Sequence, residues 1–564
     1  MEISSLHLKG FRNFDDALIN FNSSTLIIGS NDIGKSNMLH SLRILLDKSL
    51  SEADIEPSEL DFHIGLDGTS QYVEITITFK DVKEDSVLSI LKGNVNDNGE
   101  TIFRYTANKS DLSYKLWVGQ SLEDLQEVTS RFYLKYINLK YIQSQRDLNR
   151  VIAKEKKQLL RIAQQVLNEN DSQEDETLLT EISTDLAKLN RKVAKLNYVK
   201  SATDDINSEL KKLAYHNSNY SVQLDTGAIE VNDFIDKLQL GASTGGESVM
   251  LGGDGRNNQI LLALWKAKSI IEQDTDHEVV FYVVEEPEAH LHPHQQRKLA
   301  TYLIEELPGQ TIISSHSPQI ATNFTPDSIV RLLSFKNSTI AASNGCSQCI
   351  AESWNSMSYR MSILPAEAFF SNGVFLVEGP SEMLFYHELA KQIGINLDFK
   401  NLSILSVDGI SFSVYVQILN ALNIPWVMRT DNDINKIKGK SQWQFAGANR
   451  CLSAANLSKL KHSDIKLSPT DAFNNGTWKI VSDAVNCKGI YLSKVDLETD
   501  LVTELPESIV KALEKSDTNG AIKYLQGKKA LRMRPLLKKI DNDLASITSG
   551  DLARPLHKLV EMVR

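Results

Sequence analysis

The first part of the chain carries short apolar runs and alternating apolar and polar positions, which are typical of β-strands. Residues 72–80 alternate cleanly, and residues 25–28 form an apolar run that predicts a buried strand. Residues 36–48 place several apolar side chains on one face and predict an amphipathic helix. Further buried strands are predicted at 279–284 and 311–314. Strands that alternate with helices in this way favour an α/β fold with a parallel sheet.

The segment from residue 147 to residue 216 is rich in Lys, Glu, Leu, Ala and Gln and contains no Pro or Gly. It predicts two or three long amphipathic helices, with a polar break near residues 168–176. An exposed apolar seam along such helices needs a partner. We therefore expect a helical dimerisation element inserted into the first domain, with a solvated helical arm as the alternative.

The sequence pattern changes again at residues 324–365, which are predicted to be rich in loops. Beyond it, apolar strands at 373–377, 402–407 and 424–429 alternate with helices and predict a second, smaller parallel sheet. The expected domains are an N-terminal lobe at 1–146, the helical insertion at 147–240, a second lobe at 241–345 and a separate domain at 346–564.

Composition alone excludes few classes of protein. The 564 residues are 41% apolar and 24% charged, which is ordinary for a globular protein. We find no apolar run of about 20 residues and no signal-peptide pattern, so a cytoplasmic protein without membrane contact is expected. Cys346 and Cys349 form a CxxC without a second Cys/His pair nearby, which favours two loop thiols over a zinc site. The net charge of −11 does not exclude DNA binding, because DNA responds to local basic surfaces.

The segment 29–36 (GSNDIGKS) fits the phosphate-loop pattern GxxxxGK[ST] between a predicted strand and a predicted helix. Asn31 and Gly34 belong to this loop, whose backbone N–H groups would surround phosphates at the helix N-terminus. Lys35 is expected to reach the β- and γ-phosphates, and the hydroxyl of Ser36 is expected to hold Mg²⁺. The sequence therefore predicts a site for ATP with Mg²⁺.

Acidic residues and a histidine follow the next two predicted strands. Glu285 is expected to assist the Mg²⁺ shell, and Glu286 is expected to polarise the attacking water. His316 follows the strand at 311–314 and is expected to contact the γ-phosphate. The alternatives are a solvated acidic turn and a structural histidine.

These motifs together resemble the ABC-type ATPases of the SMC, RecF and OLD group. The resemblance implies a head-to-head pair in which the signature loop of the second protomer closes the nucleotide site. The matching stretch is 251–256 (LGGDGR), in which Gly253 and Gly255 would allow close approach to phosphate. The family usually has Ser at the position of Gly252, so nucleotide sensing with slow turnover is as open as brisk hydrolysis.

A second acidic pattern lies in the C-terminal part of the chain. Glu378 ends a predicted strand, and Glu382 lies on the first turn of the following helix. Asp431 and Asp433 follow another strand, on which alternate residues face the same side. Four carboxylates on neighbouring strands suit Mg²⁺ or Mn²⁺. In a two-metal site one ion would lower the pKa of the attacking water, and the other would stabilise the leaving oxygen of a phosphodiester.

This pattern resembles the Toprim domain of topoisomerases, primases and OLD nucleases. Downstream, Asp496 and Glu498 are two residues apart on a predicted strand and would complete the metal shell. The segment 527–539 then holds six basic residues and no acidic one. DNA-phosphate contact is favoured over a solvated helix face, with Lys529 stabilising the transition state.

The combined architecture resembles the OLD-family nucleases and, within them, the nuclease subunits of the Gabija antiphage system. The resemblance covers nearly the whole chain and is carried by the segments 11–14, 31–36, 42–48, 285–288, 378–382, 430–433 and 490–498. It implies cleavage of double-stranded DNA, a dimer of dimers, and a UvrD-like helicase partner. It also implies that nucleotide bound at the ATPase restrains the nuclease until nucleotide is lost during phage replication.

Two other functions remain open from the sequence. One is a RecF/SMC-like ATPase that binds DNA without cutting it, and the abundance of carboxylates argues against it because buried charges without metal are costly. The other is a topoisomerase or primase, for which we find neither a separate tyrosine-bearing domain nor a zinc module.

Overall fold

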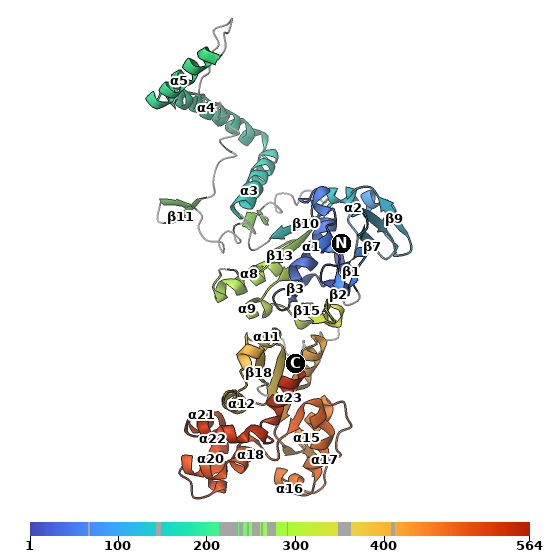
Figure 1. The fold of residues 1–564 in the computed structure, drawn as a ribbon, viewed down its shortest axis with the longest axis vertical. Helices are drawn as coiled ribbons and strands as arrows, with labels where there is room; N and C mark the ends of the chain where they lie inside the picture. The colour runs from blue at the N-terminus through green and yellow to red at the C-terminus, as the bar shows by residue number, and fades with distance from the viewer. Residues whose placement is uncertain are drawn as a thin grey trace. The chain divides into compact units, whose positions relative to one another are not determined.

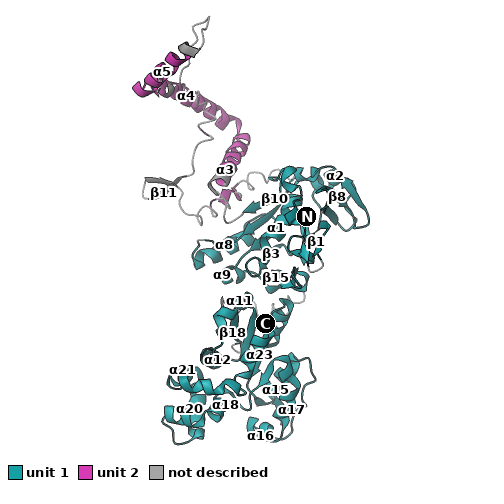
Figure 2. Cartoon of the chain, viewed as in Figure 1, with its two compact units in different colours: residues 1–143, 277–564 teal, residues 144–276 magenta. Residues whose placement is uncertain are grey.

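The protein is described from a computed structural model, which forms two compact units, residues 1–143 with 277–564 and residues 144–276 (Figure 2). The described residues are 1–65, 68–142, 148–193, 195–213, 235, 241–244, 247–250, 260, 263–264, 266–267, 278–289, 291–347, 363–407 and 412–563. None of the helices among these residues is both long and apolar enough to cross a membrane.

An antiparallel sheet dominates the N-terminal part of the larger unit (Figure 1). Its strands in spatial order are β2 (Phe14–Asn20), β1 (Glu2–Phe11), β6 (Tyr72–Lys80), β7 (Thr101–Asn108), β8 (Tyr114–Gly119) and β9 (Leu125–Val128). The alternation at 72–80 predicted β6, because one of its faces is buried: Val73, Ile75, Ile77 and Phe79 are at most 1% exposed.

A second sheet carries the phosphate-loop segment. Its order is β10 (Ile137–Ile142), β13 (Val279–Glu285), β14 (Thr311–Ser314), β3 (Ser24–Ile28), β15 (Ile329–Phe335) and β16 (Ser338–Ala341). The pairings from β10 through β15 are parallel, and β16 pairs antiparallel with β15. The expected strands at 25–28, 279–284 and 311–314 are confirmed. The prediction of a loop-rich segment from residue 324 is wrong at its start, since β15 and β16 complete this sheet.

Helix α1 (Lys35–Leu46) follows β3 directly, as the apolar face of 36–48 predicted. Met38, Leu39 and Leu42 are fully buried, which places this face in the hydrophobic core of the N-terminal part of the larger unit. Two more helices belong to the same region, α8 (Pro293–Glu305) and α9 (Pro318–Ala321), and α2 (Asp85–Leu91) follows β6.

A four-stranded parallel sheet forms the C-terminal part. Its order is β18 (Leu402–Ser406), β17 (Gly373–Val377), β19 (Trp426–Thr430) and β22 (Ile490–Leu492), with every pairing parallel. The three predicted strands of this sheet are confirmed. The helices are α11 (Ile363–Ala368), α12 (Pro380–Gln392), α13 (Leu397–Lys400), α14 (Phe412–Ala421), α15 (Ala446–Ala454), α16 (Pro469–Asn474), α17 (Thr477–Val485), α18 (Leu497–Glu504), α19 (Pro506–Ala512), α20 (Thr518–Gly527), α21 (Lys529–Lys539), α22 (Asp541–Leu544) and α23 (Arg554–Met562).

One arginine joins these two sheets. Arg331 on β15 pairs with Ile28, the last residue before the phosphate loop. Its guanidinium donates hydrogen bonds to the carbonyl oxygens of Leu422 (3.0 Å), Asn423 (2.9 Å) and Ser371 (3.2 Å). These carbonyls lie in the loops that precede β19 and β17, so the side chain contacts the C-terminal sheet at the entry to its two central strands.

Among the described residues of the smaller unit are the helices α3 (Leu148–Gln165), α4 (Glu169–Val193) and α5 (Asn197–Leu213), and a hairpin of β11 (Gly241–Thr244) and β12 (Glu247–Met250). Apolar side chains along the helices are exposed: Leu178 is 49%, Leu189 is 53% and Tyr198 is 72% exposed. The predicted polar break at 168–176 is wrong after its first residue. Asn168 accepts a hydrogen bond from Asp171 N–H, and the acidic run that follows is helical.

Candidate functional site

The phosphate-loop segment lies between β3 and α1, and the side chain of Asn13 lies directly against the backbone of Gly34 in this loop. Gly34 has φ +101°, and a Cβ there would lie 1.9 Å from Nδ2 of Asn13, so only glycine fits. The same Nδ2 donates a hydrogen bond to the carbonyl of Ile33 at 2.7 Å. Asn13 therefore holds the loop from the first hairpin, a role that the sequence analysis did not assign. Asn31, at the tip of the loop, is exposed.

The predicted phosphate- and Mg²⁺-binding groups lie together at the end of this loop. Lys35 Nζ donates to the carbonyl oxygens of Gly29 (3.1 Å) and Ser30 (3.0 Å), and burial lowers the pKa of this lysine. The hydroxyl of Ser36 donates to the carboxylate of Glu285, which ends β13. A serine hydroxyl and a carboxylate in contact are the oxygen donors expected for the metal of a bound nucleotide.

The remaining groups of this site surround Glu285. The phenol of Tyr141 donates to its second oxygen, a contact the sequence did not indicate. His316 Nε2 lies 3.4 Å from Glu286 Oε1, and burial, followed by the charge of Lys35, lowers the pKa of His316. Gly252, Gly253 and Gly255 lie outside the described residues.

Glu288 has a structural role that the sequence analysis did not separate from the acidic run. Its carboxylate accepts hydrogen bonds from the backbone N–H of His316 (2.6 Å) and the hydroxyl of Ser315 (2.8 Å), and burial raises its pKa. It thereby fixes the turn that carries His316. Cys346 is partly buried beside Thr25, and this burial raises the pKa of its thiol, whereas Cys349 lies outside the described residues.

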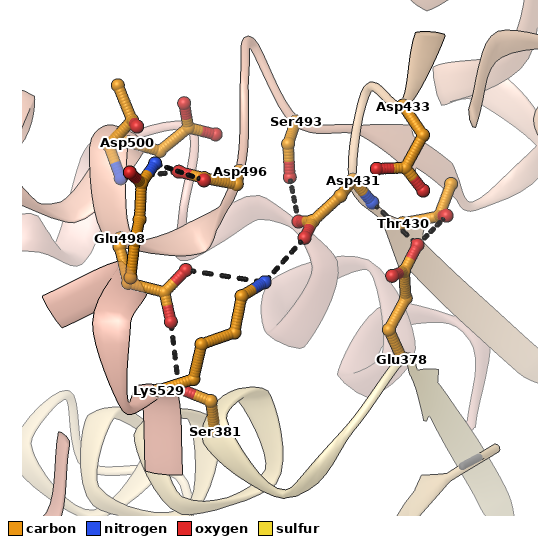
Figure 3. Close-up of polar contacts among 12 residues, drawn as sticks. Glu378, Ser381, Thr430, Asp431, Asp433, Ser493, Asp496, Glu498, Asp500 and Lys529 are labelled. Carbon is orange, nitrogen blue, oxygen red and sulfur yellow. Dashed lines mark hydrogen bonds and ion pairs between the residues drawn. The ribbon is translucent and has the colours of Figure 1, made fainter. Parts of the chain in front are cut away.

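In the C-terminal sheet, Glu378 and Asp431 follow adjacent parallel strands. β17 and β19 pair with Leu376 opposite Met428, so both acidic residues emerge at the same edge. The backbone N–H of Asp431 donates to Glu378 Oε1 at 2.9 Å, and the hydroxyl of Thr430 donates to the same oxygen (Figure 3). The carboxylate of Glu378 is therefore in direct contact with the backbone of Asp431.

The expected geometry of Asp431 and Asp433 on one face of a strand is wrong. β19 ends at Thr430, and the three residues that follow form a turn in which Asn432 N–H donates to the carbonyl of Val495 at 2.9 Å. Asp431 Oδ2 lies 3.1 Å from Lys529 Nζ, whereas Asp433 Oδ2 contacts Arg450 at 2.5 Å. The two carboxylates thus have different cationic partners.

Asp496 and Glu498 do not lie on a strand either. Asp496 is the N-cap of α18, and its carboxylate accepts from Thr499 N–H at 2.8 Å and from Gln526 at 2.6 Å. An N-cap side chain followed by a helix explains the error, because the capped turn overrides the two-residue spacing. Glu498 lies in the first turn of α18 and is fully buried.

Lys529 connects this helix to the strand-end acids (Figure 3). Its Nζ lies 3.1 Å from Asp431 Oδ2 and 3.6 Å from Glu498 Oε2, while Ser381 donates to Glu498 Oε1 at 3.1 Å. Burial opposes the charge of Lys529, but Asp431 and Glu498 outweigh it and raise the pKa of the lysine. Residues from β17–α12, β19, α18 and α21 therefore meet in one cluster.

The carboxylates of this cluster favour protons in the absence of metal. Burial is the main cause that raises the pKa of Glu378, Asp431 and Glu498. Burial, followed by the charge of Asp431, raises the pKa of Glu382 to about 7. Protons and divalent cations would compete for these oxygens, and for Glu382 this competition would fall near neutral pH.

The donor set of the cluster fits Mg²⁺ or Mn²⁺ in chemistry, since every ligand is a hard oxygen. Glu498 Oε2 is buried and accepts no hydrogen bond within the described structure, and Lys529 lies 3.6 Å from it, so this oxygen could serve as a ligand once the lysine moves. No three acidic, His or Cys side chains among the described residues converge as a metal site. Lys529 and Arg450 lie among the carboxylates instead, so metal binding requires these cations to move.

Arg450, on α15, was not identified from the sequence. Its guanidinium lies 3.0 Å from Glu378 Oε1 and 2.5 Å from Asp433 Oδ2. An arginine 17 residues after Asp433 on an unremarkable helix carries no motif, and only the packing of that helix reveals it.

Among the described basic residues at 528–539, Lys529 is the one whose side chain contacts the acidic cluster, through Asp431 and Glu498. Arg532 donates to the carbonyl of Tyr524, and Lys539 Nζ donates to the carbonyl of Ala512 at 2.8 Å. Lys528, Arg534 and Lys538 are exposed.

Comparison with known proteins follows the same division. The AAA ATPase domain family matches residues 1–133 and 105–321, and the TOPRIM domain of overcoming lysogenization defect (OLD) protein-like sequences matches residues 369–433. Endonuclease GajA of Bacillus cereus (strain VD045) is 26% identical over 573 residues, which cover 96% of each chain.

Two solved structures show local similarity. An SMC head bound to the C-terminal winged-helix domain of ScpA is 18% identical, covers 60% of this chain and 97% of its own, and has a TM-score of 0.36. The C-terminal region of the Burkholderia pseudomallei OLD protein is 20% identical, covers 35% of this chain and 100% of its own, and has a TM-score of 0.23. With an AAA ATPase match over more than half of its length, the chain belongs to the AAA ATPase domain family, and the TOPRIM match that follows shows that it also carries an OLD-like TOPRIM domain.

Proposed function

We propose that this protein is a divalent-metal-dependent endonuclease that nicks or cleaves double-stranded DNA under the control of bound nucleotide. The observation that carries the proposal is the meeting of Glu378 and Asp431 at the same edge of a parallel sheet, with buried Glu498 joined to Asp431 through Lys529. The similarity to an endonuclease over 96% of both chains supports the same conclusion.

The acidic cluster would hold two Mg²⁺ or Mn²⁺ ions. The ligands would come from the carboxylates Glu378, Glu382, Asp431, Asp433, Asp496 and Glu498. Bound there, the ions would supply an activated water and charge stabilisation at the scissile phosphate. Asp496 also accepts two hydrogen bonds, which fix α18 and with it the position of Glu498.

Lys529 would act on the phosphate itself. Its ammonium lies between Asp431 and Glu498, with the side chain 44% exposed. A cation at this place would stabilise negative charge that develops on the phosphate oxygens. The exposed basic residues of α21 would then contact neighbouring DNA phosphates.

The nucleotide site would bind ATP with Mg²⁺ through Asn31, Gly34, Lys35 and Ser36. Glu285 would share the metal with Ser36, Glu286 would orient water, and His316 would contact the γ-phosphate. Gly253 and Gly255 would be supplied by a second protomer, and Gly252 in place of serine would favour slow turnover or nucleotide sensing.

Several wider features belong to the proposal through the OLD and Gabija resemblance. The domains would run 1–146, 147–240, 241–345 and 346–564, with the exposed apolar side chains of α4 and α5 covered in a dimer. The assembly would be a dimer of dimers that acts in the cytoplasm with a UvrD-like helicase subunit in antiphage defence.

The test is cleavage of supercoiled plasmid with Mg²⁺ or Mn²⁺, with and without ATP. Glu378→Ala and Asp431→Ala should abolish nicking, while Glu507→Ala, an exposed acid on α19, should leave it unchanged. Full cleavage by both cluster variants would contradict the proposal.

A second candidate is a RecF/SMC-like ATPase that binds DNA without cutting it. The pairing of the cluster with Lys529 and Arg450 favours it, because these cations balance the buried carboxylates without metal. DNA binding without cleavage under any divalent metal would support this candidate and exclude the nuclease.

A further inference from the structure

Helix α15 is pressed against the turn that carries Asp431 and Asp433. A Cβ on Gly447, in the first turn of α15, would lie 2.0 Å from the carbonyl oxygen of Asp431 and 2.8 Å from the nitrogen of Asp433. The N–H of Gly447 donates to the carbonyl of Asp433 at 3.1 Å. Only glycine permits this approach, so the position of α15 is tied to the backbone of the acidic turn.

One turn further along α15, Arg450 spans two acids from neighbouring strands. Its Nη2 lies 3.0 Å from Glu378 Oε1, 2.5 Å from Asp433 Oδ2 and 3.3 Å from the carbonyl oxygen of Asp431. Its Nε is buried without a hydrogen-bond partner in the described structure. A single cation between these two carboxylates offsets part of the repulsion between their like charges.

Two cations therefore divide the acidic cluster between them. Lys529 contacts Asp431 and Glu498, and Arg450 contacts Glu378 and Asp433. A divalent ion held by Glu378 and Asp433 would draw on the same two carboxylates that Arg450 contacts. An arginine donor and a metal ion cannot both occupy the same lone pairs, because each requires direct contact with the oxygen.

We propose that Arg450 is a positioning residue that competes with the divalent cation for Glu378 and Asp433, and so sets the metal concentration at which the cluster loads. The inference rests on the proposed function, since it assumes that the cluster is a metal site. In the metal-free protein Arg450 keeps the two carboxylates close together, and metal binding releases its guanidinium toward solvent, to which its side chain is 33% exposed.

The test is Mn²⁺ binding to the full-length, nucleotide-free protein, measured by isothermal titration calorimetry and by electron paramagnetic resonance of free Mn²⁺. Sites that disappear in Glu378→Ala are assigned to the cluster. Arg450→Gln should lower the Mn²⁺ dissociation constant of these sites by about three- to tenfold, because charge-assisted hydrogen bonds that oppose loading are removed. Arg450→Lys should give a smaller change.

Lys479→Gln, which removes an exposed cation from α17, is the matched control and should leave the constant unchanged. An unchanged or raised constant in folded Arg450→Gln, checked by circular dichroism, would overturn the inference. If Arg450→Gln does not fold, the constant of Arg450→Lys decides in the same way. Metal binding without DNA cleavage would contradict the proposed nuclease function but not the competition between Arg450 and metal. DNA cleavage together with an unaltered Mn²⁺ dissociation constant in Arg450→Gln would contradict only the competition.

Discussion

Lys529 Nζ lies 3.1 Å from Asp431 Oδ2, although the two residues are 98 positions apart in the chain. The contact joins the N-terminus of α21 to the end of β19 and places an ammonium group inside the acidic cluster. Asp431 is only 6% exposed, and the ammonium group of Lys529 is the cation in contact with its carboxylate.

Replacing Lys529 should therefore reduce catalysis more than metal binding. Lys529→Ala is expected to slow plasmid nicking by about 100-fold or more, the scale found when a donor to a developing oxyanion is removed. Lys529→Arg should retain part of the rate. Single-turnover cleavage at saturating Mg²⁺ measures the effect, with Lys523→Ala on the exposed side of α20 as control. A rate within threefold of the wild type would exclude a role for this ammonium at the phosphate.

Substitutions at the nucleotide site should affect the control of cleavage by ATP without affecting its dependence on metal. Lys35→Ala and Ser36→Ala should abolish ATP binding, because both groups belong to the phosphate loop and Ser36 contacts Glu285. Cleavage in these variants should become insensitive to added ATP while the metal dependence stays unchanged. Binding of a fluorescent ATP analogue and nicking with and without ATP test this, with Lys48→Ala, just after α1, as control. Continued control by ATP in a variant that cannot bind it would refute the assignment.

The pH dependence of stability follows from Glu382. Its pKa is raised from 4.5 to about 7, so the folded metal-free protein binds this proton more tightly than the unfolded chain. The resulting stability is fully present below about pH 4.5 and is lost as the pH rises through about 7. At about 1.4 kcal/mol per pKa unit, the limiting loss is roughly 3 kcal/mol.

Urea unfolding of the metal-free protein at several pH values should show this decline, and Glu382→Gln should flatten it. Mg²⁺ should reverse it, because metal binding strengthens as the carboxylates lose their protons. Stability that rises between about pH 5 and 7 without metal would contradict the raised pKa of Glu382.

The sequence predicted most of the strands because burial leaves a pattern. The alternation at 72–80 and the apolar run at 25–28 became β6 and β3, and the glycines and lysine of the loop between β3 and α1 identified its chemistry. Such signals are local, since they depend on residues within one element. The pairing of β17 with β19, which brings Glu378 to Asp431, followed from the expectation of a parallel sheet.

The errors have physical causes that are also visible in particular residues. The spacing of Asp496 and Glu498 predicts a strand, although an Asp directly before Leu497, followed by acidic residues in the next turn, is an N-cap signal in the sequence. Arg450 and Tyr141 could not be found in this way, because their contacts with Glu378 and Glu285 depend on helices and strands far apart in the chain. Tertiary packing creates these contacts and leaves no periodic pattern.

Arg331 offers a prediction about cooperativity. Its guanidinium satisfies three carbonyl oxygens at the entry to β17 and β19, and burial lowers its pKa to about 10. Arg331→Ala would remove these three hydrogen bonds, two of them part-buried, and should destabilise the fold by about 1–3 kcal/mol, since one hydrogen bond contributes about 0.5–1.5 kcal/mol. Calorimetry should show the single main transition broadening or splitting as the C-terminal sheet uncouples. A transition unchanged in midpoint and width would show that the contact contributes nothing.

Gly447→Ala tests whether the approach of α15 shapes the acidic turn. The added Cβ would meet the Asp431 carbonyl at 2.0 Å, and backbone atoms on both sides cannot yield as a flexible side chain would. We expect a loss of stability of about 1–3 kcal/mol together with impaired cleavage, because the helix must retreat and carry Arg450 with it. Gly65→Ala is the control, since its nearest neighbour is the His63 side chain at 3.4 Å and its φ is not positive. Urea unfolding and plasmid nicking should separate the two variants, and a Gly447→Ala protein as stable and active as the control would show that α15 is not anchored to the turn.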